Sequence, residues 1–307
     1  EVEESYRNMK EVLDGHPDVV ENALEAIRRA GIEPRVEPIR GGTDGSRLCF
    51  MGLPTPNIFA GEHNFHSRYE WISIQDMHKA VDVIVELIGG YSPARELVLK
   101  AIANGKHVVT ANKALIAEFG NELFALAEEH GACLRFEAAV AGGIPIIKSV
   151  REGLAGNHIE WLAGIINGTG NFILTEMRDK GREFADVLRE AQELGYAEAD
   201  PTFDVEGIDA AHKLTILASL AFGIPLQLDK CYTEGISRIE PQDVAYAEKF
   251  GYRIKHLGIT RRTNQGIELR VHPTLIPRRR LIANVDGVMN AVLIKGDAVG
   301  PTLYYGA

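Results

Sequence analysis

Cysteine, aromatic residues and long apolar runs are all scarce in this chain. The three cysteines, Cys49, Cys133 and Cys231, are widely spaced and form no C-x-x-C pair. This excludes a cysteine zinc site and a disulfide framework, and it fits a reducing cytoplasm. No apolar run reaches the roughly 18–20 residues that span a bilayer, so we expect no membrane helix and no membrane partner. Residues 1–7 are too charged for a signal peptide.

Positive charge is also in short supply. Lys and Arg total 33 against 43 Asp and Glu, which gives a net charge of −10. Such a surface repels phosphate backbones, so nucleic acid is not an expected partner. The run Arg278-Arg279-Arg280 is interpreted as a solvated loop. With 307 residues, of which 45% are hydrophobic, the chain has room for two ordinary domains.

The chain begins without Met, inside a helix-like segment, and is therefore interpreted as a fragment or a join of fragments. Residues 1–80 predict a small α/β piece, with helices at 2–13 and 17–30, a strand at 35–39 and a Gly-rich loop at 41–45. Residues 77–88 fit either a helix or a strand, because Met77, Val81, Ile84 and Ile88 have helical spacing within a β-branched run. We favour a strand at 83–87, where the two halves of the chain meet.

Beyond residue 89 helices and strands alternate. Helices are expected at 93–104, 113–129 and 145–154, and strands at 106–110 and 133–137. This alternation predicts an incomplete doubly wound parallel sheet. A mixed α+β region follows, with strands at 160–166, 267–272 and 288–295, and helices at 171–180, 184–194 and 207–222.

Asp209 and Lys213 are four residues apart on one predicted helix face. An exposed pair of this kind contributes only a few tenths of a kcal/mol, and that is the ordinary interpretation of the spacing alone. Three observations favour a site instead. The helix is otherwise apolar, an acidic loop from Gly195 to Pro201 precedes it, and the segment NGTGN at 167–171 combines Gly with hydrogen-bonding Asn and Thr.

Seven motifs together resemble homoserine dehydrogenase, in the order of that family and over about residues 82–307. They are TANK at 110–113, EAAVAGGIP at 137–145, NGTGN at 167–171, GYAEADP at 195–201, GIDAAHK at 207–213, LRVHP at 269–273 and GPTLYYG at 300–306. The resemblance implies NAD- or NADP-dependent interconversion of aspartate 4-semialdehyde and homoserine, in threonine and methionine biosynthesis. It also implies a homodimer formed through the C-terminal domain.

The resemblance assigns roles to particular residues. Lys213 and Lys113 match the proton-transfer step, and an ammonium group there can stabilise and then protonate the developing alkoxide. Glu198 and Asp209 match the carboxylates that hold the substrate amino group, and Asn167, Gly168 and Thr169 match a substrate loop. The remaining matched positions are Ile88, Gly89, Gly90, Lys113 and Gly306 for the nicotinamide half of the cofactor, and backbone oxygens of Glu137, Val140, Gly142 and Ile144 for a sodium ion.

The family's phosphate-binding turn is missing from these 307 residues, which contain no G-x-G-x-x-G. That turn receives the pyrophosphate at a helix N-terminus. We therefore expect cofactor binding to be weak or lost. The expected division is a fragment at 1–80, the remaining part of a nucleotide-binding domain at 81–145, and a catalytic and dimerisation domain at 146–307, C-terminally truncated.

Residues 1–80 resemble the closing segment of peptidase T, a dizinc tripeptide aminopeptidase. The motifs are PIRGGTDG at 38–45, MGLP at 51–54, PNIFAG at 56–61 and HNFH at 63–66. In that family the position of His66 is a metal ligand, and Arg40 lies near the substrate carboxylate. A catalytic zinc needs about three protein ligands, and the other family ligands are absent. His66 is therefore interpreted as a plain polar residue, and zinc is not expected.

Three classes of function compete for the chain. An oxidoreductase of the homoserine dehydrogenase type accounts for about three quarters of the residues. A metallopeptidase fragment accounts for the rest, and an inactive chimera of the two is the third alternative. We take the first as the identity.

Overall fold

The structure is a computed structural model that describes residues 9–29, 32–36, 49–50, 62–63, 71–72 and 91–307. The chain divides into two compact units, residues 1–89 and residues 90–307. The expected loop at 41–45, the expected strand at 83–87, and Arg40, His66, Ile88, Gly89 and Gly90 lie outside the described residues.

The described residues of the first unit include two consecutive helices near its start and a short strand pair. Helix α1 spans Lys10–Leu13 and α2 spans Pro17–Arg29, and α2 buries Ala23 and Ala26 on one stripe. Strands β1 (Glu62–His63) and β2 (Trp71–Ile72) pair antiparallel. The predicted strand at 35–39 is wrong at its first two positions, which adopt no regular structure. Val36 is 77% exposed there, so its β-branched side chain has no face to bury.

The second unit begins with alternating helices and strands. Helix α5 (Ala94–Ala103), strand β3 (Val108–Val109), helix α6 (Lys113–Glu129) and strand β4 (Leu134–Arg135) follow one another. β3 and β4 pair in parallel, as the alternation predicts. Arg95 donates charge-assisted hydrogen bonds from Nε and Nη2 to the carboxylate of Glu122, and this pair joins α5 to α6.

A tight turn leads out of this part. A 3₁₀ turn, Glu137–Ala139, precedes the short helix α7, Ile146–Lys148. The Glu137 carboxylate accepts hydrogen bonds from the backbone N–H groups of Ile147 and Lys148 at 2.9 Å each, and so satisfies the start of α7. The helix expected at 145–154 is present, but its second half is a π-helix, Ser149–Gly153.

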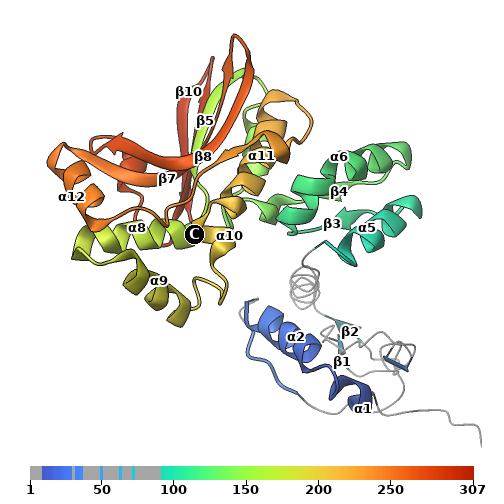
Figure 1. Ribbon diagram of the computed structural model, residues 1–307. Helices are drawn as coiled ribbons and strands as arrows, with labels where there is room; N and C mark the ends of the chain where they lie inside the picture. The colour runs from blue at the N-terminus through green and yellow to red at the C-terminus, as the bar shows by residue number, and fades with distance from the viewer. Residues whose placement is uncertain (1–8, 30–31, 37–48, 51–61, 64–70, 73–90) are drawn as a thin grey trace, which may run out of the picture. The chain divides into compact units, whose positions relative to one another are not determined.

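A six-stranded mixed sheet follows, in the order β10-β9-β5-β7-β8-β6 (Figure 1). All neighbours are antiparallel except β6 and β8, which are parallel. The strands are β5 (Ile159–Ile165), β6 (Tyr232–Thr233), β7 (Tyr252–Thr263), β8 (Gly266–Pro277), β9 (Asn290–Gly296) and β10 (Gly300–Gly306).

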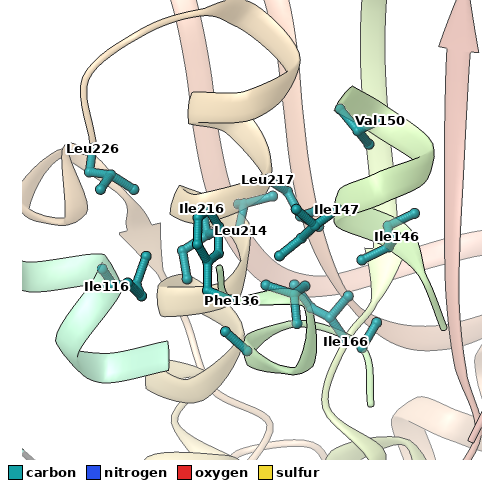
Figure 2. Packing of buried hydrophobic residues seen from close by; sticks show 14 of the residues in the cluster. Ile116, Phe136, Ile146, Ile147, Val150, Ile166, Leu214, Ile216, Leu217 and Leu226 are labelled. Atoms are coloured by element: carbon teal, nitrogen blue, oxygen red, sulfur yellow. The ribbon is translucent and has the colours of Figure 1, made fainter. Parts of the chain in front are cut away.

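Helix α11, Ile208–Phe222, connects this sheet to the first part of the unit. It contacts β5, β7 and β8 on one side and α6 on the other. Figure 2 shows the shared core, in which Leu214 and Leu217 of α11 lie beside Ile147 of α7. Asn121 on α6 both donates to and accepts from the backbone of Leu226. The α/β part at residues 94–135 and the mixed sheet therefore share one core.

The remaining helices pack together beside β7 (Figure 1). They are α8 (Gly168–Lys180), α9 (Phe184–Glu193), α10 (Thr202–Val205) and α12 (Pro241–Lys249). Three expected helices are thus found within a few residues of their predicted bounds. Among the described residues, no helix is long and apolar enough to cross a membrane.

Candidate active site

Two lysines from distant parts of the second unit converge on one buried carboxylate. Lys113 Nζ lies 3.1 Å from Asp209 Oδ1, and Lys213 Nζ lies 2.7 Å from Asp209 Oδ2. The Asp209 side chain is only 5% exposed, whereas those of Lys113 and Lys213 are 36% and 17% exposed. The i,i+4 pair is therefore a buried ion pair with a second cation, and the surface interpretation of Asp209 and Lys213 is wrong.

Local structure fixes each member of this cluster. Lys113 is the first residue of α6, and the side chain of Asn112 caps that helix by accepting a hydrogen bond from the Leu115 N–H at 3.0 Å. Asp209 and Lys213 are one turn apart on α11. Lys213 Nζ also donates to the carbonyl of Ile166 at 2.8 Å. The ammonium of Lys213 is thus held by two acceptors at the end of β5.

Asn167 brings a second carboxylate into the cluster. Its Nδ2 group donates to Asp209 Oδ2 at 2.9 Å and to Asp204 Oδ1 at 2.7 Å. Its Oδ1 accepts from the Gly170 N–H at 2.7 Å, which caps α8. Sequence reasoning missed Asp204, because the four-residue helix α10 that carries it is too short for a periodic signal. Its position just downstream of the acidic loop was the one available indication.

The two carboxylates have pKa shifts of opposite direction. Burial alone would raise the pKa of Asp209, but the ammonium groups of Lys213 and Lys113 outweigh burial, and the pKa lies below its usual range. Burial raises the pKa of Asp204, and the charge of Asp209 adds to that increase while the hydrogen bond from Asn167 opposes it. Asp209 is therefore the permanent anion of the pair, and Asp204 is the first to accept a proton.

The polar side chains of the segment from Asn167 to Asn171 form hydrogen bonds with other groups of the protein. Thr169 Oγ1 donates to the Tyr196 carbonyl at 2.6 Å, and Asn171 Nδ2 donates to the carbonyls of Val285 and Met289. A Cβ on Gly168 would lie 2.7 Å from the Val288 carbonyl oxygen, so only glycine allows this approach. The hydrogen bonds of Thr169 and Asn167 hold neighbouring loops and carboxylates in place.

Glu198 is the expected residue that the structure does not bring into contact with the cluster. Its side chain is exposed, and no hydrogen bond or ion pair of that side chain is found within the described part of the chain. Its backbone carbonyl accepts from Gln192 Nε2 at 3.1 Å, and its loop is tied to α8 through Thr169 and Tyr196. Glu198 thus lies on a loop anchored to the site, with a free carboxylate.

The turn expected to bind sodium lies beside the end of β10. Ala141 and Gly142 both have left-handed φ values, 59° and 54°. Across the residues described here, the carbonyl groups of Val140 and Gly142 accept no hydrogen bond. A Cβ on Gly306 would lie 2.9 Å from Ile144 Cγ1, so Gly306 packs against the same turn. The turn that is expected to bind sodium and Gly306, which is expected to contact the cofactor, therefore lie next to each other. Within the described residues, no cluster of three or more His, Cys, Asp or Glu side chains is placed to hold a metal.

A matched pair of substitutions tests the charge pattern. Asp209→Asn should lower the free energy of unfolding by about 2–3 kcal/mol at pH 7, below the roughly 3–5 kcal/mol of a fully buried pair because Lys113 reaches solvent. Asp204→Asn keeps an oxygen acceptor for Asn167 and removes a buried charge, so it should change stability little or increase it. Urea unfolding monitored by fluorescence measures both.

The pH dependence of the two carboxylates should also differ in sign. The contribution of Asp209 is present above the unfolded pKa of about 3.9 and is lost as pH falls through its lower folded pKa. The folded pKa of Asp204 is raised, so its burial penalty disappears as pH falls through that value. Equal destabilisation by Asp209→Asn and Asp204→Asn at pH 7 would contradict this assignment.

Comparison with known protein families places this site in context. The model of the family "Homoserine dehydrogenase" matches residues 145–307, and that of "Homoserine dehydrogenase, NAD binding domain" matches residues 62–137. A model of peptidase family M20/M25/M40 matches residues 1–89.

Individual relatives agree with the first two matches. A homoserine dehydrogenase from Pseudomonas aeruginosa is 77% identical over 287 residues, which cover 93% of this chain and 63% of the relative. One from Neisseria gonorrhoeae is 68% identical, covering 94% and 63%. The crystal structure of a homoserine dehydrogenase from Thiobacillus denitrificans superposes with a TM-score of 0.72 at 62% identity, covering 95% of this chain and 65% of that one. The chain thus spans slightly less than two thirds of the length of these relatives.

Proposed function

Because the chain belongs to the homoserine dehydrogenase family, we propose that its site binds homoserine and aspartate 4-semialdehyde and interconverts them with a nicotinamide cofactor. The observation that carries the proposal is the convergence of Lys113 and Lys213 on Asp209 at 3.1 and 2.7 Å. Paired lysines next to a buried carboxylate provide both a proton donor and a counter-charge where an alkoxide develops.

Lys213 is the proposed proton donor to the substrate oxygen. A bound nicotinamide would supply the hydride for semialdehyde reduction, and negative charge would then develop on the former carbonyl oxygen. An ammonium held by Asp209 and the Ile166 carbonyl is already oriented, so it stabilises that charge without reorganisation. It then transfers its proton, and in the reverse direction the amine accepts the proton from the homoserine hydroxyl. Lys113 supplies a second positive charge at the same carboxylate.

Carboxylates in and beside the cluster are the proposed ligands of the substrate amino group. Asp209 and Glu198 carry this role in the family pattern, and Asp204 joins them because Asn167 holds it beside Asp209. A free ammonium on the substrate matches a site with two close acidic side chains. Thr169 contributes by anchoring the Glu198 loop through the Tyr196 carbonyl.

Of the residues proposed to contact the cofactor, Lys113 and Gly306 lie in the part of the chain that the structure describes. Lys113 lies at the start of α6, directly after β3, at the carboxyl end of a parallel pair where dinucleotides bind in open α/β sheets. Gly306 lies against Ile144. A homoserine dehydrogenase from a hyperthermophilic archaeon, 30% identical with a TM-score of 0.61 over 71% of this chain, has been solved in complex with NADPH.

A monovalent cation site at the turn 140–144 is part of the same proposal. The free carbonyl groups of Val140 and Gly142 fit a hard cation such as sodium, which prefers oxygen ligands. The carbonyl of Ile144 fits less well, because it already accepts the Ile146 N–H at 2.7 Å. The backbone carbonyl of Glu137 would complete the set, since the hydrogen bond that it accepts from the Val140 N–H, at 3.5 Å, is long.

The direct test of the activity is a product assay. The purified chain is incubated with aspartate 4-semialdehyde and millimolar NADPH, and homoserine is identified by mass spectrometry. Formation of homoserine that depends on both reagents supports the proposal. Its absence, under conditions in which a full-length relative forms it, would refute activity in these 307 residues.

We further propose that the N-terminal unit derives from a metallopeptidase of the M20 family, on the strength of the match over residues 1–89. The motifs of this unit resemble the closing segment of peptidase T, with His66 at a ligand position. The dizinc peptidase alternative and the inactive chimera both depend on this unit. We keep the division at 81–145 and 146–307 and a homodimer through the C-terminal domain. The wide spacing of the three cysteines, with no C-x-x-C pair, supports a cytoplasmic location.

Metal analysis separates these alternatives. The purified chain should hold well under one zinc per chain, because a catalytic zinc takes about three protein ligands and His66 supplies one. Plasma emission spectrometry after dialysis measures this. A tightly bound zinc, lost in His66→Ala together with hydrolysis of a tripeptide, would revive the peptidase function.

A further inference from the structure

A lysine on strand β7 is fully buried beside helix α8, whose first turn lies at the site. Lys255, on β7, is only 1% exposed. Its Nζ donates to Asn171 Oδ1 at 3.0 Å, to the Val285 carbonyl at 2.6 Å and to Asp286 Oδ1 at 3.0 Å. An ammonium has three N–H donors, and each has an acceptor here. Burying an ammonium is costly unless it is paired in this way, so its position needs an explanation.

Three residues on one face of helix α8 form hydrogen bonds with a single loop. Asn171, Thr175 and Arg178 are spaced i, i+4 and i+7 and therefore share a face. Asn171 Nδ2 donates to the carbonyls of Val285 and Met289 at 3.0 and 3.1 Å. Thr175 Oγ1 accepts from the Gly287 N–H at 3.2 Å, and Arg178 Nη1 donates to Asp286 Oδ1 at 2.7 Å. All these partners belong to residues 285–289, which we call the strap.

Lys255 decides the orientation of the Asn171 amide. The amide oxygen faces the ammonium, so the NH₂ group must face the two strap carbonyls. A rotated amide would direct its N–H groups at Lys255 and its oxygen at carbonyl oxygens, and both contacts would be repulsive. Without the cation, only the strap contacts would hold the amide in place.

The strap and the first turn of α8 lie in direct contact with the site. The Asn171 N–H donates to the Asn167 carbonyl at 3.3 Å, one helical turn away. The Val288 carbonyl of the strap lies where a side chain on Gly168 would have to be. Asn167 in turn donates to Asp209 and Asp204. A continuous chain of hydrogen bonds therefore runs from Lys255 to the site carboxylates.

We propose that Lys255 is a positioning residue, which holds Asn171 and the strap against the first turn of α8 so that Asn167 keeps Asp209 and Asp204 in place for the substrate amino group. Only the identity of the ligand in this inference rests on the proposed function. The geometry of the turn does not.

The position of the Asn171 amide should depend on pH, because Lys255 can lose its proton. Burial lowers the pKa of Lys255 to about 8, against the opposing effect of Asp286, while Arg178 on α8 and Arg253 on β7 lower it further. Glu248 on α12 pairs with Arg253 at 3.4 Å. Asp286 itself stays ionised, with a pKa lowered to about 2 despite partial burial, because Arg178 and Lys255 bond to it. Loss of the Lys255 proton between pH 7 and 9 should therefore loosen the Asn171 amide.

The experiment compares Lys255→Met with Lys249→Met, a change at an exposed lysine of α12. In Lys255→Met, hydrogen exchange of peptide 166–172 should become about tenfold faster, the equivalent of one lost hydrogen bond, while peptide 113–129 of α6 keeps its rate. Homoserine affinity by calorimetry should fall about tenfold. Lys249→Met should change neither quantity.

Each outcome decides something. Faster exchange at 166–172 with no homoserine binding in any form upholds the positioning role and refutes the proposed ligand. Uniformly faster exchange, or unchanged exchange at 166–172, overturns the positioning role. If Lys255→Met does not fold, the unsubstituted chain decides by itself. The exchange rate of peptide 166–172 relative to peptide 113–129 should rise between pH 7 and 9, and a constant ratio overturns the inference.

Discussion

Lys213→Ala should slow semialdehyde-dependent NADPH oxidation by about 10²–10⁴-fold at a fixed cofactor concentration, which is the usual contribution of a positioned general acid. The methyl side chain removes the proton donor and leaves Asp209 with Lys113 as its remaining cation. The KM for aspartate 4-semialdehyde should change much less, because the carboxylates that hold the amino group remain. Absorbance at the nicotinamide band measures the rate.

Two further variants make this result specific. Lys213→Arg keeps the positive charge but replaces the amine with a group that stays protonated, so it should remain slow while preserving the Asp209 ion pair. Lys180→Ala removes an exposed lysine that pairs with Glu176 on α8 and should keep full activity. A kcat unchanged in Lys213→Ala would contradict a proton-transfer role for this residue.

Nicotinamide cofactor binding by these 307 residues should be weak or undetectable, whatever the state of the substrate site. In the intact family the pyrophosphate is held by backbone N–H groups and a helix N-terminus in a G-x-G-x-x-G turn, and the sequence contains no such turn. Each such contact contributes on the order of 1.5–3 kcal/mol. Losing two or three removes roughly two to six powers of ten in affinity.

The Gly-rich loop at residues 41–45 is the obvious substitute in the sequence. Asp44 would place a carboxylate beside the phosphates, and the same segment belongs to the peptidase motif. Fluorescence titration with NADH and NADPH tests this directly. Micromolar binding of either cofactor that is lost in Gly42→Trp would refute the expectation and would mean that the N-terminal unit had rebuilt a phosphate site.

Local patterns predict the helices of this protein well. α6 begins at Lys113 and α11 runs from Ile208 to Phe222, within a residue or so of the predicted bounds, since both have an apolar stripe and a defined end. Spacing also brings Asp209 and Lys213 together. It cannot bring Lys113 to the same carboxylate from almost a hundred residues away, because that contact depends on how α6 packs against α11. Only the family resemblance anticipates it.

The missed elements have a common physical reason. β7 buries Lys255 and His256 in the middle of the strand, and their partners come from the strap and from the Glu234 carbonyl. A charged residue at a core position breaks the alternation by which strands are predicted. Distance along the chain also hides the role of Asn171 in positioning the site. Its partners at 285–289 lie more than a hundred residues further along the sequence.

The central claim is that the cluster around Asp209 holds a small amino acid with a hydroxyl group in reach of Lys213. Calorimetric titration of L-homoserine tests it most directly, because it does not need the cofactor. The account predicts saturable one-to-one binding to the unsubstituted chain, and affinity at least about tenfold weaker in Asp209→Asn, where a charge-assisted contact is lost. Undetectable binding to a folded chain, or equal affinity in Asp209→Asn, would contradict it.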